Sequence, residues 1–393
     1  MKKYDICIIG GGASGMAAAA EAVETAENID IIIIEKKEAL GKKVAATGNG
    51  RCNITNTEAY RNDVVKAFLE HNGIVLRTEE AGRMYPYSGR ASHVVMAFER
   101  KLRDAGVDIV TGKSVIAVKK DGDIFKIATD DGKIIEASKL IIACGGKSSP
   151  QLGTTGDGYA WAKSFGHTVT RLAPVLTNIE LFESDFGGKE VKGVRAKGAV
   201  SLVKNGEDEV LATENGEIQF NETGISGICV FNISRFVKVE EGETIKDLSG
   251  KYEVVIDFMP EYEFTEALEI IKSQASCCNE IKDALVTVID EKLIPVIIKK
   301  ARKIYGQIDD AEKVAMVLKE FKCSVKGAGG WKNAQVTSGG VKLSEICKDT
   351  MESKLVQGLY FAGEILDYDG PCGGYNLNFA WYTGIKAGKA ASR

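Results

Sequence analysis

Three glycines near the N-terminus, Gly10, Gly12 and Gly15, form the pattern G-x-G-x-x-G between two segments of different character. Residues 4–9 before them are apolar and β-prone, which predicts a buried parallel strand. Residues 16–26 after them are rich in alanine, which predicts a helix. A strand that turns through glycines directly into a helix is the first half of a Rossmann-type unit. This segment therefore constrains the fold more than any other part of the chain.

A second apolar segment, residues 29–34, is followed by Glu35, twenty residues after the last glycine of the pattern. In a Rossmann-type unit the glycines permit a tight turn, a close approach of backbone to a pyrophosphate, and close packing of helix on strand. The helix N-terminus supplies N–H donors, and the acid accepts the ribose hydroxyls. The pattern predicts a dinucleotide site for FAD or NAD, and the acid argues against a 2′-phosphate. We expect contacts at Gly10, Gly12, Ala13, Ser14, Gly15, Glu35 and Lys36.

Composition narrows the classes of protein that this chain can belong to. A length of 393 residues predicts two or three domains, and 44% hydrophobic residues provide for a sizeable core. The net charge of −4 gives no basic surplus for nucleic acid or for an anionic membrane. The nine cysteines form no C-x-x-C pattern and are expected to be reduced thiols. No apolar stretch is long enough to span a membrane, so we expect a soluble, cytoplasmic protein with a small-molecule substrate.

A predicted β-meander favours FAD over NAD. Residues 114–118, 124–129 and 133–136 are strand-like and are separated by Asp-Gly turns, and a buried strand follows over residues 139–144. A meander that leads back into a parallel strand is typical of FAD domains of the glutathione-reductase type. Domains that bind only NAD usually lack it.

The chain as a whole predicts an α/β fold, namely a glutathione-reductase-type FAD-binding Rossmann domain with a β-meander, interrupted by an insert. Residues 1–172 and 327–393 are expected to form this discontinuous domain. Residues 173–262 predict a β-rich insert on the substrate side, and residues 263–326 predict a helical insert.

Two further glycine-rich segments are expected at the cofactor. Backbone N–H groups and cations of residues 41–53 can line a ribityl–pyrophosphate chain, with candidate contacts at Lys42, Lys43, Gly48, Asn49, Gly50, Arg51, Cys52 and Asn53. Near the C-terminus a strand ends at a small-small-acid turn, and a glycine pair then opens the last helix. The N-terminus of that helix can face the electron-rich edge of a flavin ring. The candidates here are Gly363, Glu364, Gly374, Tyr375 and Asn376.

Eight short motifs carry a resemblance to a known family: GGGASG (10–15), GNGRCN (48–53), TGDG (155–158), GISG (224–227), VTSGGV (336–341), TMESK (350–354), FAGE (361–364) and GGYN (373–376). Together, and in this order along essentially the whole chain, they resemble the bacterial FAD-dependent oxidoreductases of the YhiN/BaiN type. That group includes aminoacetone oxidase and a proposed bile-acid enone reductase.

The resemblance implies non-covalent FAD and adds cofactor contacts at Val115, Gly145, Gly146, Thr155, Gly156 and Asp157. The chain departs from the family at two places. Glu222 stands where the family often has a histidine, and Pro371-Cys372 stands where it often has a bulky aromatic residue. Both places are expected near the substrate, so the substrate can differ from that of better-known members.

The chemistry expected at the flavin ring is hydride transfer through its N5 atom. Arg51, Glu222 and Tyr375 are the candidate catalytic side chains. One reaction would reduce a conjugated C=C bond with electrons from NAD(P)H, and another would oxidise a small amine with oxygen. A flavin-binding module that acts in RNA modification or redox sensing is the alternative from another class, and an NAD dehydrogenase is the weakest alternative. Arg51 could lower the pKa of the Cys52 thiol, and His167 is expected to cap a helix.

Overall fold

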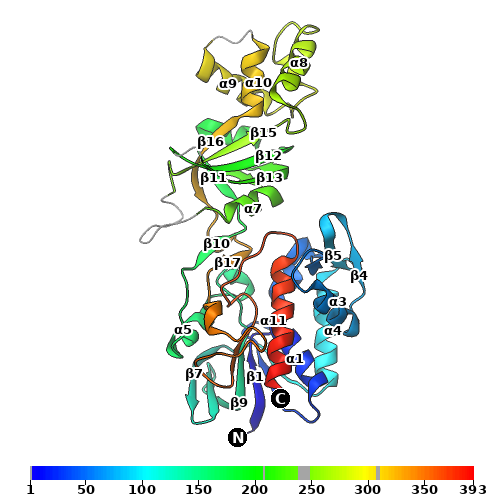
Figure 1. Ribbon diagram of the computed structural model, residues 1–393, viewed down its shortest axis with the longest axis vertical. Helices are drawn as coiled ribbons and strands as arrows, with labels where there is room; N and C mark the ends of the chain where they lie inside the picture. Colours follow the sequence, from blue (N-terminus) through cyan, green and yellow to red (C-terminus); the bar gives the residue numbers. More distant parts are fainter. Residues whose placement is uncertain (1, 207–208, 238–247, 307–309) are drawn as a thin grey trace. The chain divides into compact units, whose positions relative to one another are not determined.

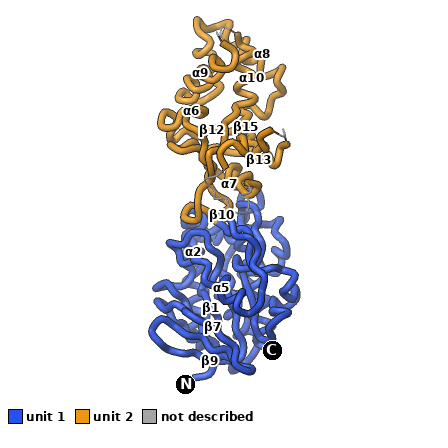
Figure 2. The backbone as a smooth tube through the Cα atoms, turned by 90° about the vertical axis from the view of Figure 1, so that its left-hand side faces the viewer, with its two compact units in different colours: residues 1–174, 336–393 blue, residues 175–335 orange. Residues whose placement is uncertain are grey.

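The computed structural model describes residues 2–206, 209–237, 248–306 and 310–393. The chain folds into two compact units (Figure 2). Unit 1 comprises residues 1–174 and 336–393, and unit 2 comprises residues 175–335. Residues 327–335, which the sequence assigns to the discontinuous domain, lie in unit 2. Residues 175–262 and 263–326, which the sequence divides into two inserts, lie in that same unit.

Unit 1 is built around a seven-stranded sheet with the order β6-β2-β1-β9-β8-β7, in which β18 also pairs with β9. The strands are β1 (Lys3–Ile9), β2 (Ile31–Ile34), β6 (Asp108–Val110), β7 (Val115–Asp121), β8 (Ile124–Thr129), β9 (Ile134–Ile142) and β18 (Leu359–Phe361). β1 pairs in parallel with β2 and β9, while β7, β8 and β9 form an antiparallel meander. The predicted Rossmann-type α/β domain with a β-meander is confirmed.

The sequence prediction of two strands at residues 133–136 and 139–144 is wrong, because β9 runs without a break from Ile134 to Ile142. Its first half pairs with β8 in the meander, and its second half pairs with β1 and β18. Residues 137 and 138 are alanine and serine, two small residues that suggest a break between strands in the sequence. Their backbone nevertheless remains extended, because neighbouring strands on both sides supply hydrogen-bond partners.

Helices cover the sheet of unit 1, and two smaller sheets complete the unit. The helices are α1 (Ala13–Thr25), α2 (Lys42–Ala46), α3 (Asn62–His71), α4 (Ala91–Asp104), α5 (Asp157–Ser164) and α11 (Tyr375–Ala391). A three-stranded sheet consists of β3 (Thr55–Asn56), β5 (Arg83–Pro86) and β4 (Leu76–Thr78), and a two-stranded sheet consists of β10 (Ala173–Val175) and β17 (Val336–Ser338). α11, near the end of the sequence, lies beside α1, near its beginning (Figure 1).

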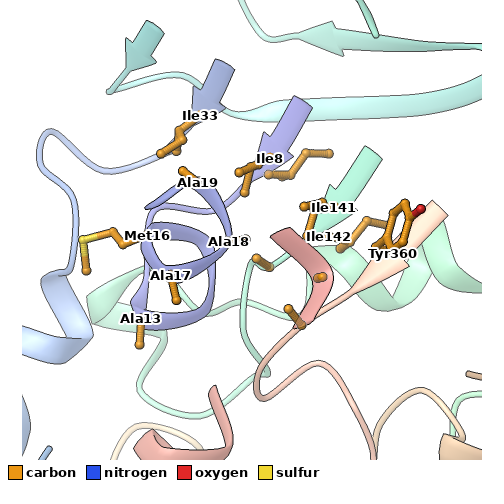
Figure 3. Close-up of a cluster of buried hydrophobic side chains, with 14 of the residues drawn as sticks. Ile8, Ala13, Met16, Ala17, Ala18, Ala19, Ile33, Ile141, Ile142 and Tyr360 are labelled. Carbon is orange, nitrogen blue, oxygen red and sulfur yellow. The ribbon is translucent and has the colours of Figure 1, made fainter. Parts of the chain in front are cut away.

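The core of unit 1 lies between α1 and the parallel strands. Ile8, Ile33 and Ile141 are fully buried, and Ala19 of the alanine-rich helix α1 lies toward Ile8 and Ile33 (Figure 3). The small side chains of α1 allow the sheet to approach it closely on one side and α11 on another. On the other side of α1, a Cβ atom added at position 388 of α11 would lie 2.1 Å from the carbonyl oxygen of Ala18.

Unit 2 contains a closed six-stranded barrel with the order β11-β14-β13-β12-β15-β16. The strands are β11 (Ile179–Leu181), β12 (Arg195–Lys204), β13 (Glu209–Phe220), β14 (Gly224–Ser226), β15 (Tyr252–Asp257) and β16 (Phe321–Ala328). The helices are α6 (Glu183–Phe186), α7 (Ile228–Ser234), α8 (Phe264–Ala275), α9 (Ile294–Tyr305) and α10 (Ala311–Lys319). Strands and helices share one hydrophobic core, so the β-rich and helical segments of the sequence form a single unit.

A buried histidine joins distant segments of unit 1. The ring of His167 has Nδ1 3.0 Å from Glu345 Oε2 and Nε2 2.7 Å from Ser353 Oγ. Because Ser353 Oγ accepts the N–H groups of Leu355 and Val356, its own proton is available to Nε2. Burial lowers the pKa of His167, and the Glu345 carboxylate acts in the opposite direction. The backbone N–H of His167 does close the end of α5, as predicted, but its ring serves this buried cluster.

His167→Gln is expected to lower the free energy of unfolding by about 2 kcal/mol at pH 7, because it leaves buried polar groups without partners. The folded-state pKa of His167 lies below its ordinary value of 6.5, so its contribution is present above pH 6.5 and is lost as the pH falls. Urea unfolding between pH 5 and 8 should therefore show a steeper acid loss for the wild type than for the variant. The exposed His93→Gln is the control, and equal slopes for wild type and His167→Gln would contradict this role.

Two further properties follow from the described parts of the chain. No helix there combines the length and the apolar character that crossing a membrane requires. No group of three or more His, Cys, Asp or Glu side chains there could hold a metal ion.

Candidate cofactor site

The loop after β1 depends on glycines for its shape. Gly10 has a φ of 105°, and a Cβ there would lie 2.5 Å from the carbonyl oxygen of Ala143, just after β9. A Cβ at Gly15 would lie 1.9 Å from the carbonyl oxygen of Gly10, so α1 packs directly on the loop. A Cβ at Gly12 would meet no described atom within 4 Å. The loop thus leaves open space at the glycine where a ligand is predicted to approach.

Among the described residues no side chain caps the N-terminus of α1, which leaves a helix end suited to an anion. Gly12 is its N-cap and offers no side chain, and the first turn contains no acidic residue. The backbone N–H groups at the start of a helix lack intrahelical partners and carry the positive end of its dipole. Ala13 and Ser14 are buried at this point, and a Cβ at Gly363 would lie 2.5 Å from Ser14 Oγ. The end of β18 therefore borders the same helix terminus.

Glu35 lies directly beside the glycine loop. Its Oε2 accepts the backbone N–H of Gly11 at 2.8 Å, and its Oε1 accepts that of Lys37 at 2.8 Å. Each carboxylate oxygen has a second lone pair, which can accept a ribose hydroxyl. The acid that the sequence predicts at the ribose therefore also fixes the glycine loop that the sequence assigns to the pyrophosphate.

Lys36 links the end of β2 to the start of α5. Its Nζ lies 2.6 Å from Asp157 Oδ2 and 2.6 Å from Thr155 Oγ1. Gly156, the N-cap of α5, has a φ of 83°. Thr155 and Asp157 lie 119 and 121 positions after Lys36 in the sequence. Lys36 and residues 155–157 were predicted as cofactor contacts, and the structure brings them together.

A second ion pair connects α2 to the turn after β18. Lys43 Nζ lies 2.6 Å from Glu364 Oε2 and also donates to the carbonyl oxygen of Ser148. Glu364 Oε1 accepts the backbone N–H of Thr337 at 2.9 Å. A Cβ at Gly146 would lie 2.4 Å from Thr337 Oγ1 and 2.8 Å from Glu364 Oε1. Four segments of unit 1 therefore converge here. Thr337 belongs to the VTSGGV motif but was not a predicted cofactor contact, and Ser148 carried no sequence signal.

Residues 47–53 form a loop in which the backbone adopts left-handed conformations. Gly48 and Asn49 both have left-handed backbone conformations, with φ of 56° and 53°. The guanidinium of Arg51 stacks on the Tyr85 ring, 4.4 Å from its centroid, and forms an ion pair with Glu79 at 2.6 Å. This candidate catalytic residue is therefore already committed to an ion pair and a cation–π contact.

The thiol of Cys52 is not activated. Cys52 is fully buried, and burial raises its pKa to about 12, while a hydrogen bond with the Thr47 hydroxyl acts weakly in the other direction. The setting beside Arg51, which could lower this pKa, does not do so, because the guanidinium is paired with Glu79 and the thiol is removed from water.

Cys52 is therefore expected to resist thiol reagents in the folded protein. Treatment with an aromatic disulfide reagent at pH 8, followed by peptide mass spectrometry, should modify the exposed Cys277 and leave Cys52 unmodified. Cys52 should react once the protein is unfolded in guanidinium, which serves as the control. Modification of Cys52 in the native protein at the rate of Cys277 would contradict its burial.

The glycine pair before α11 presses against the segment that follows Cys52. A Cβ at Gly374 would lie 2.4 Å from the carbonyl oxygen of Thr55 and 2.9 Å from Asn53 Oδ1. Among the described residues this buried Asn53 oxygen has no hydrogen-bond partner. An unpaired buried acceptor is costly, and a donor from a bound ligand would satisfy it. The turn at Gly374 is thus bordered by Asn53 Oδ1, an acceptor to which a hydrogen-bond donor of a ligand could bind.

The N-terminus of α11 resembles that of α1 in its lack of capping. Gly374 is its N-cap with a φ of 100°, no side chain caps it, and its first turn contains no acidic residue. The side chain of Asn376, a predicted cofactor contact, closes the preceding turn: Oδ1 accepts the N–H of Gly370 at 2.8 Å and Nδ2 donates to its carbonyl oxygen at 2.9 Å. Tyr375 begins the helix beside this turn.

The remaining predicted residues lie in different surroundings. Val115 begins β7 and is half-buried, Lys42 is exposed at the start of α2, and Gly145 has a φ of 75° after β9. Glu222 belongs to unit 2, where its carboxylate pairs with Lys192 at 2.7 Å and that ion pair lowers its pKa. Unit 1 therefore contains two of the three catalytic candidates, Arg51 and Tyr375.

The residues of unit 1 fit FAD at three points. Glu35 can accept the ribose hydroxyls, the uncapped start of α1 can bind the pyrophosphate, and the uncapped start of α11, beside the unpaired Asn53 oxygen, suits the polar edge of a flavin ring. A Rossmann sheet with a meander and these two helix ends define an FAD-dependent oxidoreductase. The predicted cofactor and enzyme class are confirmed by the family and relatives described next.

The chain matches the family "HI0933-like protein Rossmann domain" over residues 4–66 and 57–390. It belongs to this family. The family resemblance seen in the sequence motifs is therefore confirmed.

Among curated proteins the chain is similar to two kinds of enzyme along nearly its whole length. It is 36% identical to the 3-dehydro-bile acid delta(4,6)-reductase of Clostridium scindens, with 98% of both chains covered. It is 27% identical to the ribosomal RNA dihydrouridine synthase of Haemophilus influenzae, again with 98% of both chains covered. The corresponding synthase of Escherichia coli is also 27% identical, over 97% of this chain and 96% of that protein.

Two solved structures share the fold. A 3-ketosteroid-delta4-(5alpha)-dehydrogenase from Rhodococcus jostii, in complex with 4-androstene-3,17-dione, aligns with a TM-score of 0.51 and 14% identity over 100% of this chain and 97% of its own. The open conformation of a flavocytochrome c3 fumarate reductase aligns with a TM-score of 0.50 and 14% identity over 100% of this chain and 78% of its own. At these identities the similarity concerns the fold.

Proposed function

We propose that this oxidoreductase reduces a C=C bond conjugated to a carbonyl group in a small, steroid-like molecule, with NAD(P)H as the electron donor. The observation that carries this proposal is the 36% identity to the 3-dehydro-bile acid delta(4,6)-reductase over 98% of both chains. A match of that extent spans both the FAD-binding unit and the barrel unit. The steroid dehydrogenase and the fumarate reductase support only the fold.

In this proposal FAD, when bound and reduced, supplies the hydride, and the chain supplies its orientation and electrostatics. Glu35 and the start of α1 hold the nucleotide half, and the Lys43–Glu364 pair borders the middle of the site. The start of α11 stabilises negative charge on the edge of the flavin ring, which favours its reduced form.

The electron donor in this proposal is a nicotinamide that binds transiently. The sequence contains one G-x-G-x-x-G, and the FAD site uses it. A nicotinamide would therefore donate and leave without a Rossmann unit of its own. The proposal further places the enzyme in the cytoplasm, where this donor is available, with small molecules as its binding partners.

Anaerobic rapid-mixing of the FAD-loaded protein tests the proposal. NADH or NADPH should bleach the flavin absorbance near 450 nm, and a 3-keto-Δ4 steroid should restore it, with a saturated product two mass units heavier. Reoxidation by oxygen that is faster than by any enone, together with reduction by aminoacetone, would instead identify an oxidase of small amines. Absence of both reactions would refute the proposal.

A second candidate function is dihydrouridine formation in ribosomal RNA, favoured by the identity of 27% to two such synthases along the whole chain. Dihydrouridine is uridine whose ring C=C bond, conjugated to a carbonyl, has been reduced, so the bond type is the same. The net charge of −4 and the excess of acidic over basic residues in unit 2 favour a small substrate over RNA. Mass spectrometry of ribosomal RNA from a gene deletion separates the two, because loss of dihydrouridine would establish the RNA substrate.

A further inference from the structure

Arg83, in β5, lacks among the described residues the carboxylate partner that several cations around the candidate cofactor site have. Three of those cations pair with carboxylates at 2.6 Å: Lys36 with Asp157, Lys43 with Glu364 and Arg51 with Glu79. The half-buried guanidinium of Arg83 has no hydrogen-bonded or ion-paired partner within the described part of the chain. A partly desolvated charge without a partner is unfavourable, so an anionic ligand group would offset its cost.

The register of the small sheet determines where Arg83 points. Arg83 in β5 lies directly opposite Asn56 in the antiparallel strand β3. Side chains of directly opposed residues in an antiparallel pair lie on the same face of the sheet. Asn56 Nδ2 donates to the carbonyl oxygen of Gly373 at 2.9 Å, so this face borders the turn before α11.

A second observation places Arg83 near that turn. Burial raises the pKa of the Cys372 thiol, and the positive charge of Arg83 acts in the opposite direction. Cys372 directly precedes Gly373, whose carbonyl oxygen accepts from Asn56, the residue opposite Arg83, so this electrostatic effect agrees with the register of the sheet. The start of α11 follows at once, with neither a side-chain cap nor an acidic residue in its first turn. Arg83 and this helix end therefore direct positive potential at the same place.

We propose that Arg83 binds the carbonyl oxygen of the conjugated substrate and stabilises the negative charge that develops on it during reduction. This inference rests on the proposed function. Hydride addition to the β-carbon breaks the C=C π bond, forms a C–H bond and moves an electron pair to the carbonyl oxygen. A proton from water then adds to the α-carbon and restores the carbonyl group. A donor fixed at that oxygen lowers the barrier without taking part in the proton transfer.

The test uses FAD-loaded Arg83→Gln and Arg83→Lys, with Arg77→Gln as the matched control. Arg77 lies in the neighbouring strand β4, where its guanidinium stacks on Tyr87 and donates to the carbonyl oxygen of Tyr87 at 2.7 Å. Substituted phenols of graded acidity mimic the charged oxygen, and their binding is followed through the flavin spectrum. The wild type and Arg77→Gln should prefer acidic phenols, whereas Arg83→Gln should lose this preference and bind phenolate at least about tenfold more weakly.

Turnover supplies the second readout, with 4-androstene-3,17-dione as a substrate that has no carboxylate. Arg83→Gln should lower kcat about 100-fold, with a smaller change in KM and unchanged FAD content, and Arg83→Lys should recover part of the rate. Unchanged phenolate binding in Arg83→Gln would overturn the inference, as would loss of FAD from that variant. If the wild type fails to reduce any enone, the proposed function fails, and the phenol series still reports on the anion site alone.

Discussion

Glu35→Ala is expected to bind FAD about 100-fold more weakly than the wild type, because two hydrogen bonds to a charged carboxylate are lost. The side chain has two roles that the substitution removes together. It is placed to accept ribose hydroxyls, and it holds the N–H groups of Gly11 and Lys37 at 2.8 Å. Titration of the apoprotein with FAD, followed by flavin fluorescence, measures the change.

Two further variants make this prediction specific. Glu35→Gln keeps one acceptor oxygen and should have an affinity between those of the wild type and Glu35→Ala. Glu38→Ala, three positions along the chain and exposed, is the charge-matched control and should bind FAD as the wild type does. Equal flavin content in all four proteins after gel filtration would show that Glu35 does not hold the cofactor.

Gly388→Ala should destabilise unit 1 by about 3 kcal/mol, although alanine favours helices by about 1 kcal/mol over glycine. The new Cβ would lie 2.1 Å from the carbonyl oxygen of Ala18, so α11 and α1 must separate. Backbone atoms cannot move aside as a flexible side chain does. Because both helices begin at the candidate cofactor site, FAD should also be released at a lower temperature.

Gly330→Ala is the matched control, since its added Cβ would meet no described atom within 4 Å. It should change the unfolding temperature by no more than a few degrees. Circular dichroism measures unfolding, and flavin fluorescence measures release of the cofactor. A Gly388→Ala protein that melts with the wild type on both signals would show that the two helices are not tightly packed.

The nucleotide half of unit 1 was predictable because its signals are local. The strand, the glycines, the helix and Glu35 follow one another within thirty-five residues, and their order alone specifies the turn and the helix end. The continuity of β9 was not predictable in the same way. Whether residues 137 and 138 turn or stay extended depends on hydrogen bonds to strands that the sequence does not identify as neighbours.

The barrel of unit 2 shows the same limit over a longer range. Residues 321–328 alternate buried and exposed side chains, which is a strand signal, yet they follow a long helical segment. Their partners, β11 and β15, lie earlier in the sequence, before the helices. Closure of the barrel depends on this distant pairing, so the sequence suggests two inserts where the structure has one unit.

At the candidate site, the residue types were predictable and their partners were not. Arg51 and Cys52 stand in a segment that the sequence assigns to the cofactor, but Glu79 and burial determine their chemistry. Arg83 carries no sequence signal at all. Its position follows from a pairing with Asn56 and from a hydrogen bond between Asn56 and a glycine 317 residues further along the chain.

The position of α11 in the chain has a consequence for biosynthesis. This helix covers α1, and its start forms part of the candidate cofactor site, yet the ribosome makes it only after all of unit 2. Domains fold as units during translation, so unit 2 can fold while α1 still lacks its covering helix. The candidate cofactor site is therefore complete only after the start of α11 has been made. A chain that stops earlier lacks the helix whose Gly384 and Gly388 lie against the backbone of α1 at Ser14 and Ala18.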